Sequence, residues 1–160
     1  MSSLPGVARV LITGMSGVGK TTVLDELGRR GYRVVETDEP GWKEWRDGEQ
    51  VWRERKIAEL LAGDDGPALF VSGCVANQGR FYDRFDAVVL LSAPAPVLLD
   101  RIAARTANDF GKRPAERDQI LRDLAETEPL LRRGASHELD ATRPLADVVD
   151  ELVRIADGSA

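Results

Sequence analysis

The residues best suited to chemistry gather in a glycine-rich stretch, GMSGVGKT, at positions 14–21. It follows the apolar run VARVLIT (7–13) and precedes KTTVLDELGRR (20–30), whose apolar residues recur at helical spacing. Glycines let backbone N–H groups converge on phosphate oxygens, and the positive end of the following helix favours the same charge. Lys20 can bridge the β- and γ-phosphates, and the Thr21 hydroxyl can bind Mg²⁺.

The order of strand, G-x-x-x-x-G-K-[ST] and helix therefore predicts a Walker A phosphate loop that binds ATP. A glycine-rich turn without a ligand is the alternative. The expected nucleotide contacts come from Gly14, Ser16, Gly17, Val18, Gly19, Lys20, Thr21 and Thr22.

A second group of candidates is acidic and follows the short apolar run YRVVET (32–37). Asp38 would lie close to the phosphate loop, where a carboxylate can organise the water around Mg²⁺ or accept a proton from an attacking hydroxyl. The alternative for this aspartate is a turn or helix-capping role, which its side chain also favours.

Two other classes of phosphate-loop protein fit the sequence less well. A GTP-binding switch protein needs an N-K-x-D guanine reader, and the chain has none. A motor or transporter ATPase usually ends its third strand with an acid, whereas the run ALFVS (68–72) ends at Ser72. The position of the acids after the second strand favours a small kinase.

The elements that must position these residues alternate along the chain. Strands are predicted at 7–13, 32–37, 68–72, 86–93 and 136–140, and helices at 20–30, 48–63, 94–106, 115–134 and 144–156. This alternation predicts an α/β fold in three layers, with a five-stranded parallel sheet and helices on both faces. Together with the phosphate loop and the acids after the second strand, it favours a P-loop kinase fold. We expect one domain over residues 1–160, with a short lid at about 106–117 and an acceptor-binding region at about 38–63.

Composition limits the expected cellular location of the protein and its expected binding partners. A net charge of −5 and a pI near 5.0 argue against a nucleic-acid binder, which usually carries a basic face. A single cysteine cannot form an internal disulfide, and it suits a reducing cytosol. The start of the chain lacks a signal-peptide pattern and no apolar stretch is long enough for a membrane span, so we expect a cytoplasmic protein with no membrane partner.

Taken together, these motifs resemble those of shikimate kinase, within the P-loop nucleoside-monophosphate-kinase-like superfamily. The resemblance covers nearly the whole chain. It implies that ETD supplies Glu36 and Asp38 for metal and substrate, and that GEQVWR supplies Arg53, on a helix, for a substrate carboxylate. Pro129-Leu130-Leu131-Arg132 matches a family motif whose arginine, here Arg132, binds substrate.

The resemblance also implies roles for basic residues around the nucleotide. Arg101 or Arg105 would stack on adenine, while Lys112 or Arg113 would reach the transferring phosphate from the lid. Arg113 fits better because a proline follows it, as in the family motif. Arg143 and Pro144, in LDATRP, would border the adenine.

The acceptor region departs from the family in two respects. Ser72-Gly73-Cys74 stands where shikimate kinases have three glycines, so only Gly73 keeps the close backbone approach to substrate. The region from 38 to 53 is trimmed, yet it contains all three tryptophans. These tryptophans form either a small hydrophobic cap or an aromatic wall for a ring-bearing acceptor.

We therefore expect an ATP-dependent kinase that phosphorylates a hydroxyl of a small, anionic metabolite. Lys20, Asp38 and Arg113 would be catalytic, Thr21 and Asp38 would bind Mg²⁺, and ATP, ADP and the phosphoacceptor would be its partners. The protein would be a monomer or a small homo-oligomer. A nucleoside or nucleotide kinase, or a nucleotide-binding regulatory module without catalysis, is the alternative.

Overall fold

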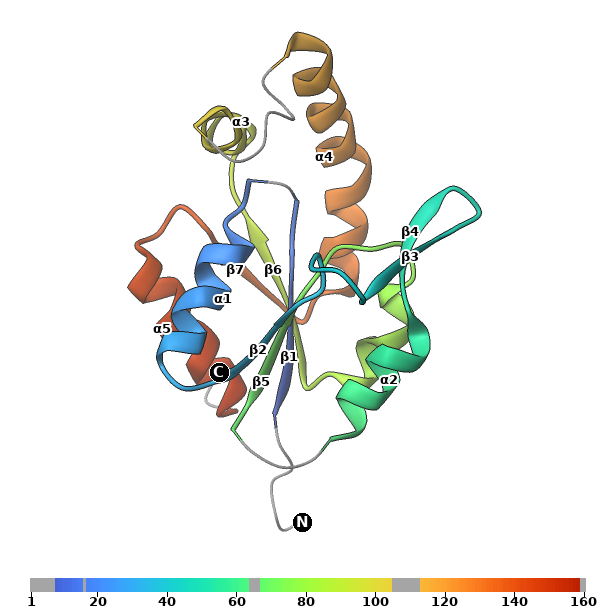
Figure 1. Ribbon diagram of the computed structural model, residues 1–160. Helices are drawn as coiled ribbons and strands as arrows, with labels where there is room; N and C mark the ends of the chain where they lie inside the picture. Colours follow the sequence, from blue (N-terminus) through green and yellow to red (C-terminus); the bar gives the residue numbers. More distant parts are fainter. Residues whose placement is uncertain (1–7, 16, 64–66, 105–112, 159–160) are drawn as a thin grey trace.

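The computed structural model describes residues 8–15, 17–63, 67–104 and 113–158. A parallel sheet of five strands, in the order β2-β5-β1-β6-β7, lies between two layers of helices (Figure 1). This arrangement confirms the predicted α/β fold class. The sheet strands are β1 (Arg9–Thr13), β2 (Arg33–Glu36), β5 (Leu69–Ser72), β6 (Ala87–Ser92) and β7 (His137–Asp140). The helices are α1 (Lys20–Arg29), α2 (Glu54–Ala62), α3 (Ala95–Ala103), α4 (Pro114–Gly134) and α5 (Leu145–Ala156), with a 3₁₀ segment η1 (Gln78–Arg84).

The central strands are continuous apolar runs because both faces of the sheet are covered. Alternation along β1 sends Val10 and Ile12 into one core and Leu11 into the other. The first core includes apolar residues of α1 and α5, and the second includes those of α2 and η1. Helices therefore cover both faces of the sheet, and the loops that contain the sequence motifs follow the carboxyl ends of its strands.

The predicted helix over 48–63 is wrong in its first part. Residues Glu49–Trp52 form strand β4, which pairs antiparallel with β3 (Lys43–Arg46) in a separate two-stranded hairpin. Asp47 and Gly48 connect the strands with positive φ angles of 54° and 80°, as a two-residue primed turn requires. This Asp-Gly turn overrides the helical periodicity, and the helix α2 begins only at Glu54.

Within the described ranges, no helix combines the length and the apolar character that crossing a membrane requires.

Candidate active site

The phosphate loop joins β1 to α1 and has the curled backbone that its glycines allow. Gly17 has a φ of 87°, and a Cβ atom there would lie 2.9 Å from the carbonyl oxygen of Leu98 in α3. A larger residue would therefore be strained by its backbone angle and would also collide with the helix. Ser16, one of the predicted contacts, lies outside the described residues.

The side chains at the start of α1 are already oriented by the protein. The Lys20 ammonium donates hydrogen bonds to the carbonyl oxygens of Gly14 and Met15, so it folds over the loop. The Thr21 hydroxyl donates to Glu36 Oε1, at the end of β2, over 2.5 Å. The structure thus places Glu36 next to the threonine that was expected to bind metal.

A cavity of about 540 Å³ opens beside this loop. It joins the phosphate loop to Asp38 on one side and to α3 and the β7–α5 turn on the other. Its lining includes Met15, Gly17, Val18, Gly19, Lys20, Thr21, Thr22, Val23, Asp38, Arg101, Ala141, Arg143, Leu145 and Val148. Most of the predicted nucleotide contacts therefore line one space.

Arg101 bridges the phosphate loop and the turn between β7 and α5. Its guanidinium donates to the carbonyl oxygen of Val18 over 2.9 Å and to that of Ala141 over 2.8 Å. The planar group is thereby held against the phosphate loop and the turn before α5. Arg143 also lines the cavity, whereas Pro144 serves as the N-cap residue of α5 and Arg105 lies outside the described residues.

Asp38 follows β2 and has a half-exposed side chain, at 56%. Its Oδ1 atom accepts a hydrogen bond of 2.9 Å from the ammonium of Lys43 in β3. Among the described residues, this is the only hydrogen bond that the Asp38 carboxylate accepts. Its Oδ2 atom is therefore available to another donor. Asp38 can therefore face both the phosphate loop and a hydroxyl in the same cavity.

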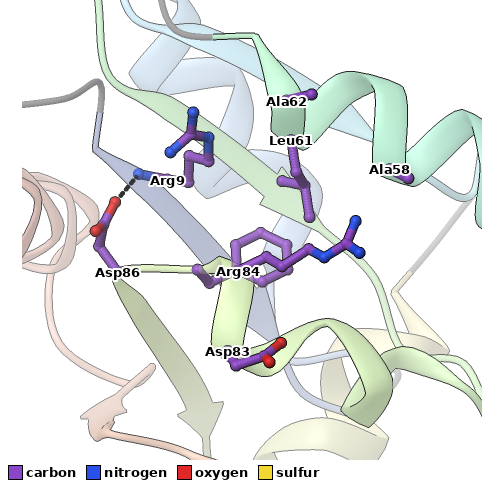
Figure 2. A pocket seen from close by; sticks show the side chains of 8 residues that line it. Arg9, Ala58, Leu61, Ala62, Asp83, Arg84 and Asp86 are labelled. Carbon is purple, nitrogen blue, oxygen red and sulfur yellow. Dashed lines mark hydrogen bonds between the residues drawn. The ribbon is translucent and has the colours of Figure 1, made fainter.

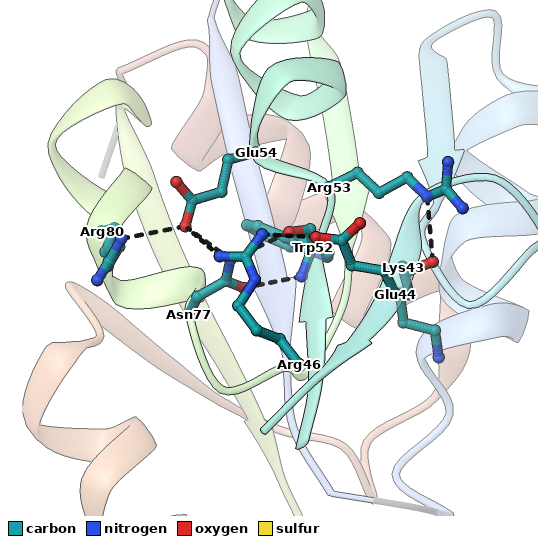
Figure 3. Close-up of polar contacts among 8 residues, drawn as sticks. All are labelled: Lys43, Glu44, Arg46, Trp52, Arg53, Glu54, Asn77 and Arg80. Carbon is teal, nitrogen blue, oxygen red and sulfur yellow. Dashed lines mark hydrogen bonds and ion pairs between the residues drawn. The ribbon is translucent and has the colours of Figure 1, made fainter. Parts of the chain in front are cut away.

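Arg53 lies at the base of the hairpin as the N-cap residue of α2, and not inside a helix as expected (Figure 3). Its backbone N–H donates to the Trp42 carbonyl over 2.8 Å, and its Nε donates to that of Lys43 over 3.3 Å. No carboxylate of the described residues forms an ion pair with Arg53. By contrast, both Arg46 and Arg80 pair with Glu54.

Gly73 has a structural reason to be glycine. A Cβ atom at this position would lie 2.5 Å from Thr37 Oγ1 and 2.9 Å from the Trp52 ring. Trp52 is fully buried; its Nε1 donates to Thr37 Oγ1 over 2.9 Å, and that hydroxyl donates to the Ser72 carbonyl over 2.7 Å. On the side where a Cβ would lie, Gly73 therefore contacts the protein's own threonine and indole.

The three tryptophans have three different environments, so neither the cap nor the wall describes them as a group. Trp52 packs in the core against Phe81, with ring centroids 5.9 Å apart. Trp42 is half-buried beneath the Lys56 ammonium, which lies 4.9 Å from its ring. Trp45, near the end of the hairpin, is 71% exposed.

Arg132 is not brought to Asp38. In α4 it forms ion pairs with Glu128 over 3.1 Å and with Glu138 of β7 over 2.8 Å. The Glu138 hydrogen bond raises the pKa of Arg132 above its ordinary value, and the same bond lowers the pKa of Glu138. Arg132 and Glu128 line a separate cavity of about 280 Å³ beside Ser92.

The lid arginine also stands apart from the cavity lining. Arg113 is the N-cap residue of α4, and its backbone N–H donates to Glu116 Oε1 over 3.4 Å. Residues 106–112 of the predicted lid, with the alternative candidate Lys112, lie outside the described residues.

A further cavity, of about 450 Å³, lies at the opposite end of the strands (Figure 2). There the backbone N–H of Arg9 donates to Asp86 over 2.7 Å, and the Arg9 guanidinium donates to the Gly63 carbonyl over 2.7 Å. Because ligands of parallel sheets bind beyond the carboxyl ends of the strands, this cavity does not belong to the nucleotide site.

Known proteins resemble this chain over most of its length. A family model described as an AAA domain matches residues 10–122. Shikimate kinase 2 of Yersinia enterocolitica is 29% identical over an alignment 169 positions long, and the match covers 91% of this chain and 94% of that protein. Shikimate kinase 2 of Sodalis glossinidius is 30% identical over an alignment 165 positions long, and the match covers 91% of this chain and 93% of that protein.

Among solved structures, a shikimate kinase from Acinetobacter baumannii in complex with shikimate has the same fold, with a TM-score of 0.64 and 20% identity. The match covers 95% of this chain and 94% of that one. The resemblance expected from the motifs is thus confirmed. With 30% identity to a relative over nine-tenths of both chains, the chain belongs to the shikimate kinase family, and it is a small-molecule kinase of the P-loop class.

Proposed function

We propose that the protein transfers the γ-phosphoryl group of Mg²⁺-ATP to a hydroxyl of a small, anionic metabolite. The observation that carries this proposal is that the phosphate loop and the Asp38 carboxylate line one cavity of about 540 Å³. A donor phosphate and an acceptor hydroxyl can therefore meet there without a rearrangement of the sheet.

The donor half of the site fits ATP and a magnesium ion. Lys20, which now donates to the Gly14 carbonyl, would reach the β- and γ-phosphates, and the planar guanidinium of Arg101 would stack on the adenine ring. Thr21 and Glu36, whose side-chain oxygens lie 2.5 Å apart, would supply two oxygen ligands for Mg²⁺. No group of three or more His, Cys, Asp or Glu side chains that could hold a metal occurs in the described part of the chain. Phosphate and water oxygens would complete the coordination, as Mg²⁺ commonly prefers, and the bound ion would neutralise phosphate charge.

The acceptor half is built around Asp38. Its Oδ2 would accept the proton of the attacking hydroxyl, which would make that hydroxyl oxygen a better nucleophile as the new bond to phosphorus forms. Arg53, whose charge has no carboxylate partner among the described residues, would bind an anionic group of the acceptor. Arg113 would approach from the lid to neutralise the transferring phosphoryl. Binding by Arg132 would require its ion pair with Glu138 to open.

Shikimate, the ligand named for the Acinetobacter baumannii structure, is the first acceptor to test. It offers both the hydroxyl and the anionic group that this site is suited to hold. Because Ser72 and Cys74 replace two of the three glycines expected there, the assay should also include other hydroxylated carboxylates, several nucleosides and several nucleoside monophosphates.

Acceptor-dependent release of ADP from Mg²⁺-ATP tests the proposal. We expect activity with at least one anionic hydroxylated metabolite and none with the nucleosides or their monophosphates. The proposal is wrong if the protein binds ATP yet transfers phosphate to no acceptor, or if only nucleosides or nucleotides are phosphorylated.

A further inference from the structure

Lys43, in strand β3 of the β3–β4 hairpin, contacts the carboxylate of Asp38. Lys43 stands opposite Trp52 in the hairpin register, and its ammonium lies between Asp38 Oδ1 at 2.9 Å and Gln50 Oε1 at 3.2 Å. The Lys43 side chain is only 18% exposed, whereas that of Asp38 is 56% exposed. A mostly buried ammonium needs acceptors nearby, so these two contacts define where it lies.

The hairpin itself is fixed to the body of the protein. Asn77, in the loop after β5, accepts a hydrogen bond from the Trp52 backbone N–H over 2.8 Å and donates to its carbonyl over 3.1 Å. The backbone N–H of Ala76 donates to the Gln50 carbonyl over 3.2 Å. Together with the buried Trp52 indole, these bonds make β4 a rigid support for its partner strand (Figure 3).

The base of the hairpin is held as well. Arg53 binds the carbonyl oxygens of Trp42 and Lys43 through its backbone N–H and its Nε, respectively. The backbone that carries Lys43 is therefore restrained on both sides of the strand pair. A lysine on such a support can hold a partly exposed aspartate in one orientation, which a solvated surface lysine would not do.

We infer that Lys43 is a positioning residue for phosphoryl transfer. By binding Oδ1, it turns the Asp38 carboxylate so that Oδ2 faces the acceptor hydroxyl. The loop after β5 then influences catalysis indirectly: Asn77 holds the hairpin, and the hairpin carries Lys43. This inference rests on the proposed function, because it assigns Asp38 the role of proton acceptor.

Steady-state kinetics of Lys43→Met, Lys43→Arg and the control Lys56→Met test this role. Lys56 is a nearby lysine whose ammonium lies over the Trp42 ring, and its loss removes the same charge without removing a contact to Asp38. We expect Lys43→Met to lower kcat about 10- to 100-fold with an unchanged Kd for ATP, because a misoriented base loses much of its effect. Lys43→Arg should recover most of the activity, and Lys56→Met should stay within about twofold of the wild type.

Two further measurements separate positioning from a general structural effect. In an Asp38→Asn background, adding Lys43→Met should lower kcat no further, since the group that Lys43 orients is gone. The ¹³Cγ NMR signal of Asp38 should shift in Lys43→Met and stay in place in Lys56→Met. This second readout does not depend on turnover.

The outcomes distinguish the two proposals. Wild-type kcat in Lys43→Met, an equal loss in Lys56→Met, or an independent further loss in the double variant would overturn the positioning role while leaving the kinase intact. A wild-type protein that phosphorylates no acceptor would instead overturn the proposed function, and the positioning role with it.

Discussion

Replacing Gly73 by alanine probes its packing against Thr37 and Trp52. The new methyl group would lie 2.5 Å from Thr37 Oγ1 and 2.9 Å from Trp52 Cζ2. Both neighbours are fully buried, so neither can rotate into solvent. The threonine or the indole must shift, and their mutual hydrogen bond of 2.9 Å would lengthen or break.

The size of the effect follows from these two changes. Forcing a methyl group into a packed core costs about 1–3 kcal/mol. Losing one buried hydrogen bond adds about 1 kcal/mol. We therefore expect the free energy of unfolding to fall by about 2–4 kcal/mol, which lowers the urea midpoint by about 1–2 M for an m-value of about 2 kcal/mol/M.

Urea unfolding followed by tryptophan fluorescence would measure this loss, with Gly79→Ala as the matched control. Gly79 lies in η1, six positions along the same segment, and a Cβ atom there meets nothing within 4 Å. Its variant should be as stable as the wild type or slightly more stable, because alanine restricts the unfolded chain. A midpoint for Gly73→Ala within about 0.3 M of the wild type, or an equal loss in Gly79→Ala, would refute the packing argument.

Three other variants give separate tests. Lys20→Ala should weaken ATP binding about 10- to 100-fold in calorimetry, because it removes a charged hydrogen-bond donor to phosphate; unchanged affinity would place the nucleotide elsewhere. Thr37→Val should lower the free energy of unfolding by about 1–3 kcal/mol, because it leaves the buried Trp52 Nε1 without its acceptor; wild-type stability would show that this bond is unimportant. The hydrogen bond from Arg132 lowers the pKa of Glu138 in the folded protein below its ordinary value of 4.5. Their pairing therefore stabilises the fold above pH 4.5, and this stabilisation is lost as the pH falls through the pKa of the folded state. Stability should accordingly fall less in Glu138→Gln than in the wild type between pH 5 and pH 3, and parallel curves would contradict the pairing.

The sheet and the phosphate loop could be predicted because the local sequence pattern there matches what the folded structure requires. Buried parallel strands are continuous apolar runs, and the spacing of the loop residues is set by the shape of a phosphate. The same logic located Asp38, since it follows β2 at the carboxyl edge of the sheet.

The acceptor region could be predicted only in part. The apolar spacing from 48 to 63 favours a helix, and only the Asp47-Gly48 turn indicates the hairpin. A two-residue turn at Asp47-Gly48 pairs the residues on either side of it and places Lys43 opposite Trp52. No local pattern shows that Asp38 is the carboxylate Lys43 binds, or that Glu138 binds Arg132. Such choices depend on which charges the folded chain brings together.

The proposed reaction requires Asp38 to act on an acceptor hydroxyl while the phosphate loop holds ATP. Its most direct test compares Asp38→Asn with the wild type, measuring single-turnover phosphoryl transfer to the identified acceptor and ATP affinity in parallel. The amide keeps the size of the side chain but is a poor proton acceptor, so we expect transfer to slow about 10²- to 10⁴-fold with ATP affinity unchanged. Transfer at the wild-type rate in Asp38→Asn would contradict the claim.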